Sequence, residues 1–231
     1  MKRFYKRAEV VPAAGGHGIT LDGRLVKTAG KHDLIVPSSA LASAVAAEWD
    51  AQEGEIRPER MPLMRLAGTT IDRNSTQREA IVHQVAHYAG TDLVCHRATH
   101  PPALAARQQA VWQPLIDWAV ERYDAPLSVT TGVIPASQPA VSLAAFTAVV
   151  AGHDDFSLTA LHAATAACGS LVIALALLEG RLDAGEAFAA SQLDESFQIE
   201  AWGEDAEQAE RRALLAAEIA AAAQFISLLR G

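Results

Sequence analysis

Five side chains between residues 83 and 100 are of the types that bind metal ions or transfer protons in enzymes: His83, His87, Cys95, His96 and His100. His83 and His87 are four residues apart, so a helix would carry both imidazoles on one face, as in zinc hydrolases. The glutamate of the H-E-x-x-H pattern is missing, because Gln84 occupies its place. A metal-dependent hydrolase that uses this cluster is the alternative function. We favour surface histidines near a buried cysteine, with no bound metal.

Two other groups of residues could in principle take part in catalysis. Cys168-Gly169-Ser170 lies in an apolar segment, where a buried thiol without a neighbouring charge is unreactive. Asp194 and Glu195 could form a carboxylate pair, but adjacent residues of a helix point about 100° apart. The sequence contains neither a G-x-S-x-G motif nor a Walker A motif. It therefore predicts a protein that is not an enzyme and that uses no cofactor and no small-molecule substrate.

The segment from Leu193 to Asp205 reads L-D-E-S-F-Q-I-E-A-W-G-E-D and fits a helix with two different faces. Leu193, Phe197 and Ala201 share a face that can be buried. The adjacent stripe combines a tryptophan with acids and an amide: Asp194, Glu195, Gln198, Trp202 and Asp205. Soluble helices usually keep tryptophan among their other apolar residues. An aromatic anchor ringed by acids predicts a partner-binding surface; the alternative is that Trp202 packs under a neighbouring helix.

Negative charge is concentrated around this segment. The net charge is −8, but residues 1–73 carry 11 lysines and arginines against 9 acids, whereas residues 74–231 carry 8 against 18. Residues 179–218 alone contain 11 acids and 3 bases. Such a field repels nucleic acid and attracts a basic protein partner. An ordinary solvated acidic surface is the other interpretation of the same charges.

The fold class expected from the pattern of residues is α+β, with a small N-terminal β-rich α+β domain followed by a larger all-α helical domain. Residues 1–37 have the signals of short strands, including a hairpin turn at Asp22-Gly23. Ser38 or Ser39 caps a helix that extends to about Gln52. Leu41, Val45 and Trp49 form its apolar stripe, so we expect Trp49 to have a structural role against the sheet.

The rest of the chain has helical periodicity. The polar stretch 72–76 is the expected junction between domains 1–73 and 74–231. The helices expected beyond it cover residues 77–89, 101–123, 140–151, 157–178, 183–202 and 205–229.

One stretch, residues 158–178, contains no charged side chain and is long enough to cross a bilayer. Its first half is only weakly apolar, so we expect a central helix that is buried on all sides, with no membrane partner. Basic residues near the N-terminus are not followed by the apolar run of a signal peptide. The two cysteines, Cys95 and Cys168, fit a reducing compartment. These features favour a cytoplasmic location.

The pattern D-E-x-x-Q-x-x-x-W-G-x-D at residues 194–205 resembles a signature of the ATP synthase F(1) assembly chaperones of mitochondria and α-proteobacteria. Further blocks occur in the same order: K-R-F-Y-K at 2–6, L-D-G-R-x-V-K-T at 21–28, E-W-D-A-Q at 48–52, M-P-L-x-x-L-A at 61–67, T-D-L-x-C-x-R-A at 91–98 and W-x-P-L-x-D-W-A at 112–119. The chain departs from the family at His96, where a second aromatic residue often follows the cysteine.

The resemblance implies a chaperone that binds the unassembled α subunit of F(1)-ATPase, prevents its aggregation and hands it on for assembly. It also implies that Glu195, Trp202 and Trp49 correspond to acidic and aromatic surface residues of the family. It implies a bacterial cytoplasmic protein, with eukaryotic relatives in the mitochondrial matrix. A scaffold with some unrelated acidic-surface role is a third possibility that the residues leave open.

Overall fold

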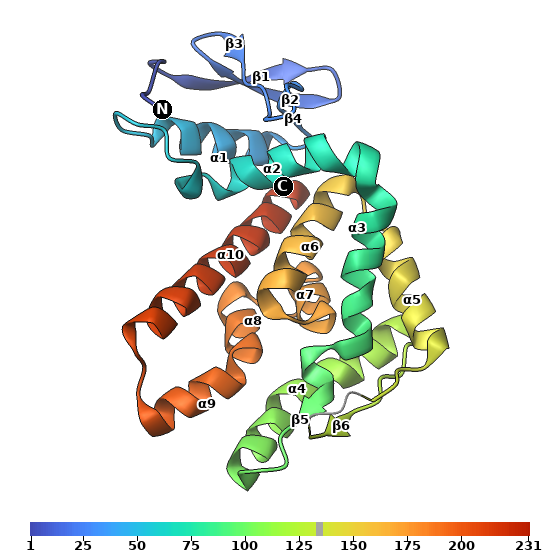
Figure 1. Ribbon diagram of the computed structural model, residues 1–231. Coiled ribbons are helices and arrows are strands. Elements are labelled where there is room, and N and C mark those ends of the chain that lie inside the picture. The colour runs from blue at the N-terminus through green and yellow to red at the C-terminus, as the bar shows by residue number, and fades with distance from the viewer. Residues whose placement is uncertain (133–135) are drawn as a thin grey trace. The chain divides into compact units, whose positions relative to one another are not determined.

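The structure is a computed structural model that describes residues 1–132 and 136–231, and only the backbone of residues 74 and 75 (Figure 1). Two units can be distinguished in it. Unit 1 contains Met1–Arg78, Asp154–Ala160 and Gln224–Gly231. Unit 2 contains Glu79–His153 and Leu161–Ala223.

The antiparallel sheet of unit 1 is built around its second strand, with which each of the other strands pairs (Figure 1). The four strands are β1 (Ala8–Ala13), β2 (Gly16–Leu21), β3 (Arg24–Leu25) and β4 (Ile35–Val36). The predicted hairpin turn is confirmed, because Asp22 and Gly23 connect β2 to β3 with φ angles of 48° and 81°. Positive φ at both positions is what a tight two-residue hairpin needs.

Helix α1 (Ser39–Asp50) packs on this sheet. Its cap is confirmed at Ser38, whose hydroxyl accepts a hydrogen bond from the Leu41 N–H at 3.1 Å. Leu41 and Val45 are completely buried. Trp49, the third residue of the predicted stripe, is half-buried.

The carboxylate of Glu48 joins α1 to α2 (Pro62–Thr69). Its two oxygens accept hydrogen bonds from the backbone N–H groups of Leu63 and Met64, each at 2.8 Å. These N–H groups lie in the first turn of α2, where a helix leaves them without internal partners. Burial raises the pKa of Glu48, and the two hydrogen bonds oppose that rise. One acid therefore fixes the start of α2.

The backbone is helical across the expected junction at residues 72–76. Helix α2 continues through the π-helical turn η2 (Thr70–Asn74) into α3 (Ser75–His87). Within unit 1, the Thr70 hydroxyl donates to the Thr159 hydroxyl at 2.8 Å, and the Ser38 hydroxyl donates to the Leu228 carbonyl. Residues 154–160 and 224–231 thus belong to the N-terminal unit. The division into domains 1–73 and 74–231 stays a prediction.

Unit 2 is mainly helical, which confirms the expected α+β fold class with its larger helical part. Its other elements, some of which extend into unit 1, are η3 (Tyr88–Thr91), η4 (Leu93–Cys95), β5 (His96–Arg97), α4 (Pro102–Tyr123), β6 (Thr130–Thr131), α5 (Ala140–Ala151), α6 (Asp155–Cys168), α7 (Leu171–Leu178), α8 (Ala184–Ser191), α9 (Leu193–Trp202) and α10 (Ala206–Arg230). Strands β5 and β6 form a short parallel pair.

The expectation of one helix over residues 157–178 is wrong. Gly169 adopts a φ of 63° and ends α6, and Ser170 then caps α7 by accepting from the Ile173 N–H. The resulting helices of 14 and 8 residues are each shorter than the roughly 20 residues that cross a bilayer. All eight residues of α7 are buried, so the expected central burial holds for that part.

Among the described residues, α10 is the one helix long and apolar enough to cross a membrane by length and composition. Its sequence is rich in alanine, and its apolar stripe is packed inside the protein: Ile219, Ala222, Phe225 and Ile226 are at most 4% exposed. The expected single helix over residues 183–202 is also divided, into α8 and α9, at Gln192.

A buried carboxylate holds the start of α7. Asp92 is inaccessible to solvent and accepts hydrogen bonds from the Ser170 hydroxyl at 2.5 Å, the Val172 N–H at 3.0 Å and the Val94 N–H at 3.2 Å. Burial raises the pKa of Asp92 to about 6, although these hydrogen bonds act to lower it. The T-D-L block therefore supplies the acceptor that the first turn of α7 would otherwise lack.

Replacing Asp92 by alanine should lower the free energy of unfolding by about 3 kcal/mol or more, because several buried donors would lose their acceptor. The pKa of the folded state lies above the ordinary value of 3.8. The folded protein therefore keeps a proton that the unfolded chain releases between about pH 4 and pH 6. The contribution of Asp92 to stability should fall as the pH rises through that window. Urea unfolding of wild type and Asp92→Asn across this range measures it; parallel pH profiles of the two proteins would contradict the assignment.

Candidate partner-binding surface

The inner face of α9 is fixed to α4 within unit 2. The indole N–H of the buried Trp112 donates to the Ala190 carbonyl at 2.8 Å, which places the end of α8 against α4. Leu193, the first residue of α9, is 4% exposed, and the guanidinium of Arg107 lies 5.3 Å from the centre of the Phe197 ring. The face predicted to be buried therefore does contact the unit, although Ala201 is exposed.

An ion pair between α4 and α9 helps to fix the orientation of α9. Arg107 donates two hydrogen bonds to the carboxylate of Glu200, at 2.7 Å and 2.8 Å. The hydrogen bonds lower the pKa of Glu200 and raise that of Arg107. Both groups face solvent, so the pair contributes more to the orientation of α9 than to stability.

The outer face of α9, which we define as Glu195, Gln198 and Trp202, points to solvent. All three residues are exposed, and Trp202 is 81% exposed, the highest fraction of any large apolar side chain among the described residues. The alternative in which Trp202 packs under a neighbouring helix is wrong for this structure. At about 100° per residue, these positions lie opposite Leu193 and Phe197. Anchoring one face of α9 thus leaves the other free.

The other two predicted stripe residues have partners within the protein. Asp194 is half-buried and accepts a hydrogen bond from the Gln108 side chain at 2.8 Å. Asp205 is exposed and accepts from the backbone N–H of Gln208 at 2.8 Å, where α10 begins. All five residues of the predicted stripe lie in or directly after α9, but Asp194 and Asp205 also accept hydrogen bonds from residues of this protein. Their contact with a partner stays a prediction.

Two residues that bind α9, Gln108 and Arg107, were not part of the predicted site, and neither was Arg97, whose charge interacts with that of Asp194. Gln108 is 1% exposed; its amide also accepts from the Ala98 N–H at 2.7 Å. Arg97 is 6% exposed and lies 5.3 Å from the Trp112 ring centre. Burial lowers the pKa of Arg97, with the Asp194 charge acting in the opposite direction. Arg107 binds the carboxylate of Glu200 in α9, as described above. The R-A pair in the T-D-L-x-C-x-R-A block is the one sequence signal that pointed to this region.

Trp49, the predicted structural residue, is in unit 1. Its ring meets that of Tyr5 edge to face with centroids 5.7 Å apart, and its carbonyl accepts from the Tyr5 hydroxyl at 2.6 Å. These contacts connect α1 to the K-R-F-Y-K block. A structural role for Trp49 stays a prediction.

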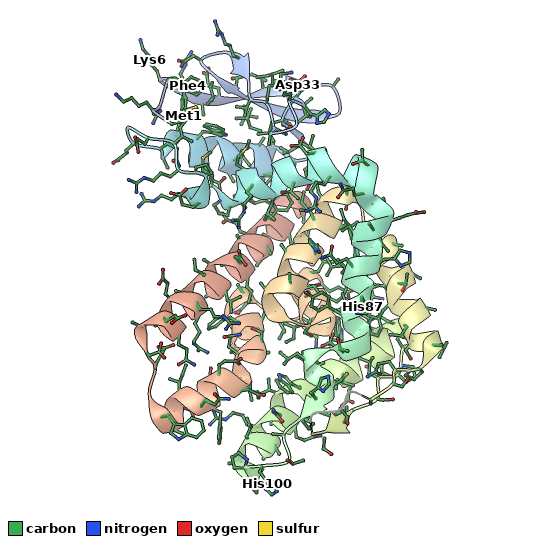
Figure 2. All side chains as sticks on the ribbon, viewed as in Figure 1. Met1, Phe4, Lys6, Asp33, His87 and His100 are labelled. Carbon is green, nitrogen blue, oxygen red and sulfur yellow. The ribbon has the colours of Figure 1, made fainter. Side chains whose placement is uncertain are left out.

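The histidine cluster is dispersed. His83 and His87 are exposed on α3, where they line a hollow with Tyr88 and Thr91. Figure 2 shows His87 and His100 well apart. Cys95 is 1% exposed, and burial raises the pKa of its thiol to about 12. In the part of the chain that the structure describes, no three His, Cys, Asp or Glu side chains are placed to hold a metal ion. The geometry therefore does not support the hydrolase alternative.

Comparison with known proteins gives one consistent result. Residues 2–120 match the model of the ATP12 chaperone protein family. The chain is 24% identical to the mitochondrial protein atp12 of Schizosaccharomyces pombe over 221 residues, which are 90% of this chain and 76% of that protein. Atp12 from Paracoccus denitrificans is 41% identical, with 99% of this chain and 98% of that chain covered and a TM-score of 0.94. The Agrobacterium tumefaciens protein Atu1473, a putative chaperone, is 39% identical to this chain, with 99% of this chain and 86% of that chain covered and a TM-score of 0.94.

Two neighbouring acids of α9 should differ sharply in their effect on stability. Asp194→Ala should lower the free energy of unfolding by about 1–2 kcal/mol, because the buried Gln108 amide would lose its acceptor. Glu195→Ala should change it by less than about 0.5 kcal/mol, since that side chain faces solvent. Urea denaturation of the two variants in parallel measures the difference. Equal losses would show that the inner and outer faces are wrongly assigned.

The histidines should be dispensable for folding. Replacing His83 and His87 together by glutamine should leave the melting temperature unchanged, and so should the addition of a chelator, because neither side chain is part of a metal site here. Thermal melts of both proteins with and without chelator provide the measurement. A drop of several degrees on chelation of the wild type would restore the metal hypothesis.

Proposed function

The chain belongs to the ATP12 chaperone family of ATP synthase assembly factors, and we propose that it binds the unassembled α subunit of F(1)-ATPase through the outer face of α9. In this proposal the bound chaperone prevents aggregation of the α subunit and then hands it on for ATP synthase assembly. The observation that carries the proposal is Trp202, which is 81% exposed and flanked by Glu195 and Gln198.

The physical case rests on what a free assembly subunit exposes. Surfaces meant for neighbouring subunits combine apolar and charged groups, and such patches aggregate when they are uncovered. A large aromatic side chain covers apolar area, while surrounding acids select a basic surface and reject an acidic one. A rigidly held helix presents both features without a folding step on binding. Trp202 and its acidic neighbours supply this chemistry.

Release in this proposal needs no catalysis. The chaperone covers a surface that a true neighbour of the α subunit binds later, so the neighbour can displace it by competition. The proposed activity therefore uses no ATP, metal ion, cofactor or small-molecule substrate, and it involves neither nucleic acid nor a membrane. Relatives occur in bacteria and in mitochondria, which fits a bacterial cytoplasmic protein with counterparts in the mitochondrial matrix.

Reversal of the charge of Glu195 tests the proposed face. Glu195→Lys would bring like charges together and should cost about 2–5 kcal/mol of binding if the contact is desolvated, roughly a 30-fold or greater loss of affinity. Glu195→Gln should be milder, because it keeps the shape and removes only the charge. Trp202→Ala should also weaken binding strongly. The measurement is light scattering of purified α subunit with each variant, alongside a thermal melt.

Glu121→Lys is the matched control, because it makes the same charge change at an exposed position of α4. It should protect the α subunit as well as wild type does. All four variants should melt near the wild-type temperature, since none of the replaced side chains is buried. Full protection by both Glu195→Lys and Trp202→Ala would refute the binding face, and failure of the wild type to protect or co-purify with the α subunit would refute the client.

A further inference from the structure

The inner face of α9 binds an arginine with a ring and a carboxylate that act together. The guanidinium of Arg107 lies 5.3 Å from the centre of the Phe197 ring and donates two hydrogen bonds to the carboxylate of Glu200. Phe197 and Glu200 are three residues apart, so they are neighbours on the helix surface. A planar guanidinium can stack on a ring while its edge donates to a carboxylate, a combination for which the compact ammonium of lysine is less suited.

A second arginine is held in the same way next to α9. Arg212 of α10 lies 5.2 Å from the centre of the Phe188 ring, and its guanidinium forms an ion pair with Glu204 at 3.2 Å. Two neighbouring places in the helical unit thus hold arginine between a ring and an acid. In both places the arginine comes from the chain itself.

The outer face of α9 also has a ring and an acid, but no arginine. Within the part of the chain that the structure describes, the side chains of Glu195, Gln198 and Trp202 form no hydrogen bond, ion pair or ring contact. All three are exposed, and the indole of Trp202 is 81% exposed. The carboxylate, the amide and the face of the ring are therefore all available to a partner.

The charge of this segment favours a cationic ligand. Residues 193–205 contain five acids and no lysine or arginine. Arg107 and Arg212, which lie beside the segment, are each paired with one of these acids, Glu200 and Glu204. Two cations against five acids leave an excess of negative charge, which attracts a cation of a partner.

The spacing of the three available side chains suits a guanidinium. Glu195 and Trp202 are seven residues apart, which is about 10 Å along a helix, and Gln198 lies between them. A guanidinium placed above Gln198 can stack on the indole and donate from its other edge toward the carboxylate of Glu195. The amide oxygen of Gln198 is a further acceptor for the five N–H donors of an arginine.

We propose that the outer face of α9 recognises an arginine side chain of the partner polypeptide, in preference to lysine. The guanidinium stacks on the indole of Trp202 and donates hydrogen bonds to the Glu195 carboxylate and the Gln198 amide oxygen. Trp202 thus acts through the face of its ring as well as through its apolar area. That the arginine belongs to the α subunit rests on the proposed function, whereas the preference for arginine can be measured without that subunit.

The indole N–H signals of the four tryptophans in a nitrogen-15 NMR spectrum provide the test. The Trp202 signal is the one that disappears in Trp202→Phe. The probes are the tripeptides Gly-Arg-Gly and Gly-Lys-Gly, blocked at both ends and titrated against the full chain at low salt. Trp118 is the internal control, because Arg181 of the same chain already lies 5.7 Å from the centre of its ring.

The arginine tripeptide should shift the Trp202 signal along a saturating curve and leave the Trp118 signal in place. The lysine tripeptide should bind at least about threefold more weakly, although its charge is the same. Glu195→Gln should weaken the arginine tripeptide by a similar factor, because the acceptor loses its charge. Glu121→Gln, which makes the same change at an exposed position of α4, should leave the titration unchanged.

The intact α subunit provides a second measurement. Trp202→Phe keeps an aromatic face, whereas Trp202→Leu keeps apolar bulk without one. Trp202→Phe should therefore bind the α subunit at least about threefold more tightly than Trp202→Leu does. Both variants should melt near the wild-type temperature, because the side chain that they replace is exposed.

Equal affinity of the two tripeptides for wild type, or no saturable shift of the Trp202 signal with the arginine tripeptide, would overturn the proposal. Equal affinity of Trp202→Phe and Trp202→Leu for the α subunit would reduce Trp202 to an apolar anchor and would overturn it as well. A saturable, arginine-specific shift in a chain that does not bind the α subunit would refute the client and support the arginine site.

Discussion

The helical unit depends on the hydrogen bonds that the buried carboxylate of Asp92 accepts at the start of α7. A helix that is buried on every side cannot use water to satisfy the N–H groups of its first turn. Asp92 and Ser170 replace that water from inside the protein. Helices α4 and α8 both pack on α7, so this acid helps to position the two elements that contact α9.

The contacts that connect α4, α8 and α9 hold α9 by one face and leave its opposite face exposed to solvent. Trp112 ties the end of α8 to α4, and Gln108 and Arg107 then bind acids of α9. Trp202 can stay exposed because α9 is held by its other side.

The sequence correctly predicted those turns, caps and helices whose stability depends on a few adjacent residues. The Asp22-Gly23 turn, the Ser38 cap and the helix at residues 140–151 all depend on a few adjacent residues. The breaks at Gly169 and Gln192 were missed because the apolar pattern continues across them. At Gly169 the decisive partner, Asp92, is far away in sequence. A helix that is apolar on every side also gives no periodic signal for where it ends.

The candidate site was predictable in part for the same reason. The unusual position of Trp202 among acids is visible in sequence, and the structure shows the side chain exposed. The inward contact of Asp194 was not predictable, because it depends on Gln108 in a distant helix.

Site-specific photo-cross-linking tests most directly whether the outer face of α9 meets the client. A photoreactive phenylalanine analogue would replace Trp202 in one protein and Glu121 in another, and each would be irradiated with purified α subunit. We predict a cross-link to the α subunit from position 202, weakened by high salt because acids select the partner, and none from position 121. A cross-link from position 121 with none from position 202 would contradict it.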